Sequence, residues 1–158
     1  MIILMNQRGR KMANDCYNYL SIDGPLTNDV VSKVINDEGD VDYNLLVPMP
    51  DNVKELPHPR KEGNYVGERD WSWENIGCPG VTSDTNIERD DTGAFISFIS
   101  EWGPPEDWFR VLSEQVHAMV GDSGNNMDIT LEYNEHDEQF AGVLKYDTQQ
   151  VDDGYYTK

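Results

Sequence analysis

Apolar residues recur along this chain with two different periods, and each period predicts one type of element. From Asp15 to Ile22 the aliphatic residues occupy alternate positions, which indicates a strand with one buried face. Beyond this strand, Thr27 is a suitable N-cap, and valines and an isoleucine follow it at helical spacing until Gly39. We therefore expect a strand over residues 15–22, followed by a helix that Gly39 stops.

The next part of the chain has a weaker pattern. Residues 43–47 (YNLLV) form a short apolar run, for which we expect a buried strand. Pro48 and Pro50 should end this strand, because proline has no N–H to donate to a neighbouring strand. Residues 48–92 contain five prolines and no sustained period, which is typical of irregular structure. The pattern therefore predicts a long irregular insertion after the second strand.

Clear periods return after residue 92. We expect a central strand at 93–102, a helix from Pro104 to Met119, a hairpin of 127–133 with 140–146, and a last strand within 151–158. The order of elements is then strand, helix, strand, insertion, strand, helix and two strands. This order predicts an α+β protein of the ferredoxin-like split βαβ type, with an antiparallel sheet and two helices on one face.

The stretch from Phe98 to Phe109 (FISEWGPPEDWF) contains two tryptophans and three acids around a Gly-Pro-Pro turn. These residues could line a cleft. Prolines and acids, however, are also favoured in the first turn of a helix. We interpret the stretch as a strand-to-helix corner and expect Trp102 and Trp108 to pack in the core.

Five sequence blocks together point to a family. They are MANDCYNYLSIDGP (12–25), LLVPMP (45–50), WSWENIGCPG (71–80), SEWGPPEDW (100–108) and LEYNEHDEQFAG (131–142). In this order they resemble the YubB-type family of ferredoxin-like proteins carried by phages and plasmids. The chain departs from the family pattern at Asp15, where the family has tryptophan, and at 75–80.

The resemblance covers most of the chain from Met12. It implies a ferredoxin-like fold and a mobile-element origin, but no activity that can be assigned to particular residues. We expect residues 1–11 to be a non-native or disordered leader and residues 12–158 to form a single domain.

The charge balance narrows the possible partners. Thirty acidic against twelve basic residues give a formal charge of −18, which repels nucleic acid and anionic membranes. The aromatic content of 10% distinguishes the chain from acidic disordered segments. Two cysteines without a CxxC motif and the absence of a signal-peptide pattern favour a cytoplasmic location in a bacterial host cell, and we interpret Cys78 as an unreactive loop residue.

Candidate catalytic chemistry is sparse. The densest set of possible metal ligands lies near the predicted hairpin turn and consists of Glu132, Glu135, His136, Asp137 and Glu138. One alternative is therefore a metal-dependent hydrolase, although solvated charges are ordinary in such a turn. Because the histidines are scattered and no nucleotide-binding motif is present, we expect no catalytic residues, no metal and no cofactor.

A second alternative uses the sheet face that the helices leave open. Tyr17, Tyr19 and Phe95 are expected on that face, where they could stack bases in a single-stranded nucleic-acid-binding module. The shortage of basic residues argues against it. Trp71 and Trp73 of the insertion could instead cover these rings, or the rings could form an exposed protein-binding patch.

The acids are the remaining functional candidates. We expect a non-enzymatic nucleic-acid mimic that inhibits a host defence complex, such as a CRISPR or restriction complex, by stoichiometric occlusion of its basic surface without contacting nucleic acid itself. The ordinary alternative is that the acids serve solubility alone. The expected partner-binding residues are Asp84, Glu88, Asp90, Asp91, Asp128, Glu132, Glu135, Asp137 and Glu138, with Trp71 and Trp73 of the insertion.

Overall fold

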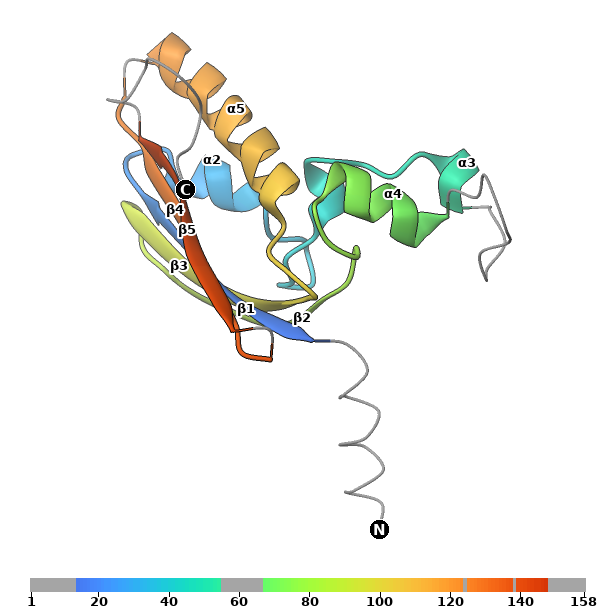
Figure 1. Ribbon diagram of the computed structural model, residues 1–158. Coiled ribbons are helices and arrows are strands. Elements are labelled where there is room, and N and C mark those ends of the chain that lie inside the picture. Colours follow the sequence, from blue (N-terminus) through green and yellow to red (C-terminus); the bar gives the residue numbers. More distant parts are fainter. Residues whose placement is uncertain (1–13, 55–66, 124, 138, 148–158) are drawn as a thin grey trace.

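The computed structural model describes residues 14–54, 67–123, 125–137 and 139–147, and it has an α+β architecture (Figure 1). In chain order the elements are β1 (Asp15–Asp23), α2 (Thr27–Ser32), the 3₁₀ helix η1 (Tyr43–Leu45), α3 (Asp51–Lys54), α4 (Glu68–Asn75), β2 (Thr82–Arg89), β3 (Gly93–Glu101), α5 (Glu106–Ser123), β4 (Asp128–Glu135) and β5 (Phe140–Asp147). Within these residues the strands form one antiparallel sheet in the order β2-β3-β1-β4-β5. The expected α+β class with an antiparallel sheet is confirmed.

Strand β1 lies at the centre of the sheet because it pairs with β3 on one side and β4 on the other. Leu20 of β1 lies opposite Ile96 of β3 and Leu131 of β4, and all three side chains are fully buried. Since side chains in paired positions point to the same face of a sheet, this register assembles one continuous apolar face from three strands. The alternation predicted for residues 15–22 is confirmed.

Helices α2 and α5 lie on this apolar face of the sheet (Figure 1). The buried stripe of α5 consists of Trp108, Phe109, Leu112 and Val116. The ring of Trp108 makes edge contacts with Phe98 of β3, with ring centroids 6.2 Å apart. Fully burying a side chain of this size contributes about 1.5–3 kcal/mol, so α5 closes the core as its helical period predicted.

The prediction of a strand at residues 43–47 is wrong. Residues Tyr43–Leu45 form the 3₁₀ helix η1, because the side chain of Asp42 accepts a hydrogen bond from the backbone N–H of Asn44 at 2.9 Å. The N–H of Val47 also donates to the carbonyl of Tyr43 at 2.9 Å. These local bonds curl the segment and leave Tyr43 buried against Trp108.

The second strand of the protein is β2, which lies inside the segment predicted to be irregular. Its sequence, TSDTNIER, has no apolar alternation, and Ile87 is the one aliphatic residue in it. Strand β2 is held by its pairing with β3 at the edge of the sheet, so its formation depends on the neighbouring strand. The insertion therefore comes before the second strand, whereas we expected it afterwards.

The insertion is also more ordered and more buried than predicted. It carries α3 and α4, and the loop after α4 contributes Ile76 and Cys78 to the core. The carbonyl of Ile76 accepts a hydrogen bond from the N–H of Trp108 at 3.1 Å, which ties this loop to the start of α5. Cys78, which we interpreted as an unreactive loop residue, lies in this loop and is fully buried.

The first helix is shorter than predicted. Helix α2 ends at Ser32, well before Gly39, and the chain continues through a turn in which the side chain of Asn36 accepts hydrogen bonds from two backbone N–H groups. Ile35 then pairs with Val41 in an isolated bridge. The apolar residues beyond Ser32 are used for packing without extending the helix.

The strand-to-helix corner is present, but only one of its tryptophans is a core residue. Trp108 is fully buried as predicted. Trp102 is only partly buried, because it lies past the end of β3 with a left-handed φ of 68° that ends the strand alternation. The hydroxyl of Ser100 donates to the carbonyl of Gly103 at 2.6 Å and closes the turn.

Among the described helices, none combines the length and the apolar composition that a membrane span requires.

Candidate interaction surface

The strand side chains that point away from α2 and α5 form a surface that we call the open face. No described helix covers it (Figure 1). Tyr19 of β1 and Phe95 of β3 lie at its centre, with 38% and 45% of their surfaces exposed. Their rings are stacked, with centroids 6.2 Å apart and an interplanar angle of 21°. Of the two alternatives left open by the sequence, cover by Trp71 and Trp73 is not found, because α4, which carries both, lies on the other side of the sheet.

Carboxylates flank these two rings. In the strand register Glu88 of β2 lies opposite Phe95, and Glu132 of β4 lies opposite Tyr19. Both acids are exposed, as is Asp23 at the end of β1 on the same face. Directly opposite residues in an antiparallel pair have Cβ atoms about 4.5–5.5 Å apart, so each ring has a carboxylate beside it.

The open face is strongly unbalanced in charge. Within the described residues, Lys145 of β5 is the basic residue that the strand registers place on this face. Asp128 lies at the start of β4, opposite Asp23, and is also exposed. The face therefore combines exposed aromatic surface with a negative potential.

A hollow of about 550 Å³ lies on the open face next to the β2–β3 turn. The residues that line it include Phe95, Ser21 and the acids Asp23, Glu88 and Asp90, with Arg89 as the basic residue among them. Because an aromatic ring and several acids border the same hollow, it is shaped and charged to receive a cationic side chain.

The β2–β3 turn fixes the position of Asp90. One carboxylate oxygen accepts hydrogen bonds from the N–H of Thr92 at 2.8 Å, the hydroxyl of Thr92 at 3.0 Å and the N–H of Gly93 at 3.0 Å. The bonds from Thr92 hold the pKa of the Asp90 carboxyl below its ordinary value. Asp90 thus shapes the turn, while Asp91 is simply exposed at its tip.

The remaining acids predicted to bind a partner are dispersed. Asp84 is exposed at an irregularity in the pairing of β2, with a left-handed φ of 52°. Asp137 is exposed in the β4–β5 turn, at the other end of the sheet from Asp91. Glu138 lies outside the described residues.

Glu135 is not a surface residue. Its side chain is fully buried, and Oε1 accepts a hydrogen bond from the N–H of Asp137 at 3.0 Å. The reason is the strand alternation: β4 extends to residue 135, so Glu135 points to the helix-covered face, opposite Cys16. We therefore remove Glu135 from the set of acids that a partner can reach.

The same alternation bears on the metal hypothesis. Glu132 points to the open face and Glu135 to the buried face, so these two carboxylates do not converge. In the described part of the chain, no three His, Cys, Asp or Glu side chains come together as potential metal ligands. His136 instead makes an edge contact with Tyr17, with ring centroids 5.4 Å apart.

The two insertion tryptophans have different environments. Trp71 packs against the core, whereas Trp73 has 41% of its surface exposed. Both belong to α4, away from the open face (Figure 1). The structure thus separates the tryptophans from Glu88 and Glu132, and contacts through the two regions can be tested independently.

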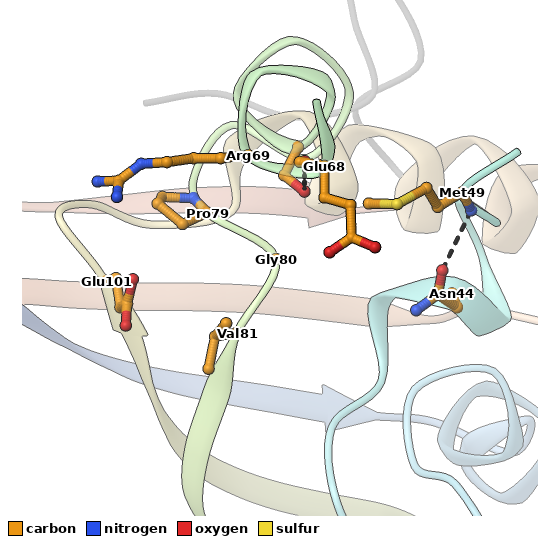
Figure 2. A pocket seen from close by; sticks show the side chains of 9 residues that line it. Asn44, Met49, Glu68, Arg69, Pro79, Gly80, Val81 and Glu101 are labelled. Carbon is orange, nitrogen blue, oxygen red and sulfur yellow. Dashed lines mark hydrogen bonds between the residues drawn. The ribbon is translucent and has the colours of Figure 1, made fainter. Parts of the chain in front are cut away.

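A pocket of about 360 Å³ lies beside α4 (Figure 2). It is lined by Asn44, Met49, Glu68, Arg69, Ser72, Pro79, Gly80, Val81 and Glu101. In Figure 2 the side chains of Glu68 and Arg69 extend from α4 in different directions. The sequence did not indicate this pocket because its residues come from four separate segments. Its lining contains two carboxylates and one guanidinium but no thiol or imidazole.

Both thiols are fully buried. Burial raises the pKa of Cys16 to about 11 and that of Cys78 to about 12. The thiol of Cys78 also donates to the hydroxyl of Tyr43, with 3.8 Å between sulfur and oxygen. Both cysteines therefore remain protonated at neutral pH and are unsuited to act as nucleophiles.

The open face contains residues that we did not single out from the sequence. Asp23 and Val143 belong to it, and Val143 has 41% of its surface exposed. The signal for Asp23 was available, because it is separated from Tyr19 by an even number of positions in the same strand. For Val143 the pairing of β5 with β4 was also required.

We found no match to the chain among protein-family models, curated proteins or solved structures. Function is therefore inferred from the geometry and charge described above.

Proposed function

We propose that this protein is a non-enzymatic acidic binding protein of a phage or plasmid, which covers the basic nucleic-acid-binding surface of a host protein and so acts as a nucleic-acid mimic. The observation that carries the proposal is the excess of acidic residues, some of which the sheet displays on its surface. Thirty acidic residues outnumber twelve basic ones, and Glu88 and Glu132 are exposed on the strands of a sheet.

A sheet is a suitable support for such charges. Same-face residues along one strand are roughly 6.8 Å apart, and neighbouring strands are about 4.8 Å apart. Because the backbone positions are fixed by pairing on both sides of β1, β3 and β4, less conformational entropy is lost when a partner binds. Occlusion of a basic groove requires no turnover, and the complex is expected to form rapidly and to weaken with salt.

We also propose that the chain has the ferredoxin-like arrangement of YubB-type proteins. The supporting feature is the antiparallel order β2-β3-β1-β4, with helical segments between β1 and β2 and between β3 and β4. Strand β5 would then be an addition beside β4.

The proposal is favoured over its two alternatives by specific features. A hydrolase using residues 132–138 would need converging carboxylates, but Glu132 and Glu135 face opposite sides of the sheet. A nucleic-acid-binding module on the open face would need basic residues to contact phosphates, and Lys145 offers one such contact among the described positions.

The test is capture of a basic partner followed by competition. The immobilised protein is incubated with bacterial lysate and eluted with increasing salt, and each retained protein is purified and titrated with this protein in the presence of labelled DNA or RNA. We expect a nucleic-acid-handling protein that elutes at raised salt and releases its nucleic acid at a stoichiometric ratio. A partner that binds this protein and nucleic acid simultaneously would contradict the mimicry.

Two variants with the same change in net charge make this test specific. The open-face triple variant is Asp23→Asn, Glu88→Gln and Glu132→Gln. The turn triple variant is Asp37→Asn, Glu38→Gln and Asp40→Asn, whose side chains are exposed in the turn after α2. Loss of affinity in either variant supports acidic docking, whereas unchanged affinity in both would remove its basis.

A further inference from the structure

The open face is a sheet surface that no described helix covers, and its composition is unusual. Its two central rings, Tyr19 and Phe95, are stacked on each other and remain more than one-third exposed. Exposed rings on a rigid sheet offer a large contact area at little entropic cost. Such a surface is expected to have an occupant.

The placement of the acids indicates the chemistry of that occupant. Across the sheet, Glu88 stands on the β2 side of Phe95, and Glu132 stands on the β4 side of Tyr19. The ring pair is therefore bordered by a carboxylate on each side. The faces of aromatic rings attract cations, and an adjacent carboxylate adds a charge-assisted hydrogen bond to the same cation.

We infer that the open face is the docking surface of this protein and that its occupant is a basic protein segment whose arginine side chains stack on Tyr19 and Phe95 and pair with Glu132 and Glu88. This inference rests on the proposed acidic binding function and names the interface and the partner chemistry. The guanidinium group is planar, so it can lie on a ring and still donate two parallel hydrogen bonds to a carboxylate.

The hollow beside Phe95 gives one of these arginines a defined place. It measures about 550 Å³ and is bordered by Asp23, Glu88 and Asp90, which outnumber Arg89, the basic residue of its lining. Asp90 is held in position by the hydrogen bonds that its carboxylate accepts from Thr92 and Gly93, so this border of the hollow is fixed before a partner binds. A guanidinium that enters the hollow would lie next to Phe95 and close to the acids that border it.

Charge argues against the other occupants. Nucleic acid would bring phosphates next to Glu88 and Glu132. A second copy of this chain, with its formal charge of −18, would be repelled as well. A basic protein segment complements both the negative potential and the exposed rings.

The experiment measures binding of fluorescently labelled nona-arginine, nona-lysine and oligothymidylate to the full chain by anisotropy at low salt. The variant Tyr19→Leu, Phe95→Leu keeps apolar side chains at both positions but removes the rings, and circular dichroism and a melting curve verify its fold. Trp73→Leu is the matched control, because Trp73 is similarly exposed but lies on α4.

We expect nona-arginine to bind the wild-type protein more tightly than nona-lysine does. The double leucine variant should bind nona-arginine about fivefold to tenfold more weakly, the loss expected for two cation–π contacts, while Trp73→Leu binds normally. Full affinity of the double leucine variant would overturn the inference, as would binding of oligothymidylate that depends on the two rings.

The acid variants separate this inference from the proposed function. If the leucine variant keeps its affinity for nona-arginine but either triple variant loses it, acidic docking stands and the inferred stacking of arginines on Tyr19 and Phe95 is wrong. If neither triple variant changes the affinity, both proposals fail. If the open-face triple variant alone loses affinity for nona-arginine, and the double leucine variant also binds it more weakly, both the proposed function and the open-face inference are supported.

Discussion

Cys16 and Cys78 illustrate how burial controls chemistry at the scale of a single residue. The sequence placed Cys78 in a loop, and the structure also has it in a loop, but one that is folded into the core beside Tyr43. Because a thiolate is disfavoured in an apolar environment, the pKa values of both thiols lie well above the ordinary value of 9.0. The residues act as apolar packing groups and not as reactive ones.

This burial predicts a loss of stability in alkali. Below the ordinary pKa of 9.0 both thiols are protonated in the folded and the unfolded chain, so they add no pH dependence. As the pH rises above 9, the unfolded chain releases these protons first, and the free energy of unfolding falls until the folded pKa values of about 11 for Cys16 and about 12 for Cys78 are passed.

Urea denaturation of the wild-type protein and of a Cys16→Ala, Cys78→Ala variant at pH values from neutral to strongly alkaline measures this effect. We expect a smaller alkaline loss in the variant, and we take the difference between the two slopes as the contribution of the thiols. Equal slopes would show that the thiols ionise alike in both states.

At the scale of elements, the connection between β1 and α2 depends on Gly24. Its φ of 135° is a conformation that side chains rarely adopt, and a Cβ there would lie 2.5 Å from the backbone oxygen of Asn126. The N–H of Gly24 donates to the carbonyl of Thr92 at 2.9 Å. At Gly24 the chain is therefore hydrogen-bonded to the β2–β3 turn and lies close to the backbone just before β4, with no room for a side chain.

We predict that Gly24→Ala lowers the free energy of unfolding by about 3 kcal/mol, because it adds both backbone strain and a steric clash. Gly39→Ala is the control, since Gly39 has a φ of 88° but open space within 4 Å of the point that a Cβ would occupy, and it should cost about 1 kcal/mol from strain alone. Chemical denaturation measures both. Equal losses would mean that the packing around Gly24 relaxes freely.

At the scale of the whole molecule, the charge of −18 acts on stability as well as on binding. Like charges on a compact chain repel one another, and salt screens this repulsion over a Debye length of about 10 Å at 0.1 M. The acids of the open face should therefore reduce the stability of the fold that supports them, as is common for binding surfaces.

We predict that raising sodium chloride from low to moderate concentration increases the Tm. If screening recovers about 1 kcal/mol, the increase should be about 2–4 °C for a chain of this size. The open-face triple variant should melt at a higher temperature than the wild-type protein at low salt and respond less to salt. A Tm that falls with salt would indicate that attractive ion pairs outweigh the repulsion.

The sequence alone determined the elements whose side chains follow a regular period. Strands β1, β3, β4 and β5 and helix α5 were predictable because each presents an apolar face, and that face identifies both the type of element and the side that is buried. The placement of Tyr19 and Phe95 on the sheet face opposite the core follows from the same alternation. The excess of acids is a property of composition and needs no structure.

Only the tertiary structure decided what depends on pairing and packing between distant segments. Strand β2 has no apolar period and exists through its hydrogen bonds to β3, while residues 43–47 resemble a strand but are curled by local bonds and by the burial of Tyr43. The orientation of Glu135 depended on how far β4 extends. The open face itself, with Glu88 and Glu132 beside the two rings, arises from strand register, which no single segment encodes.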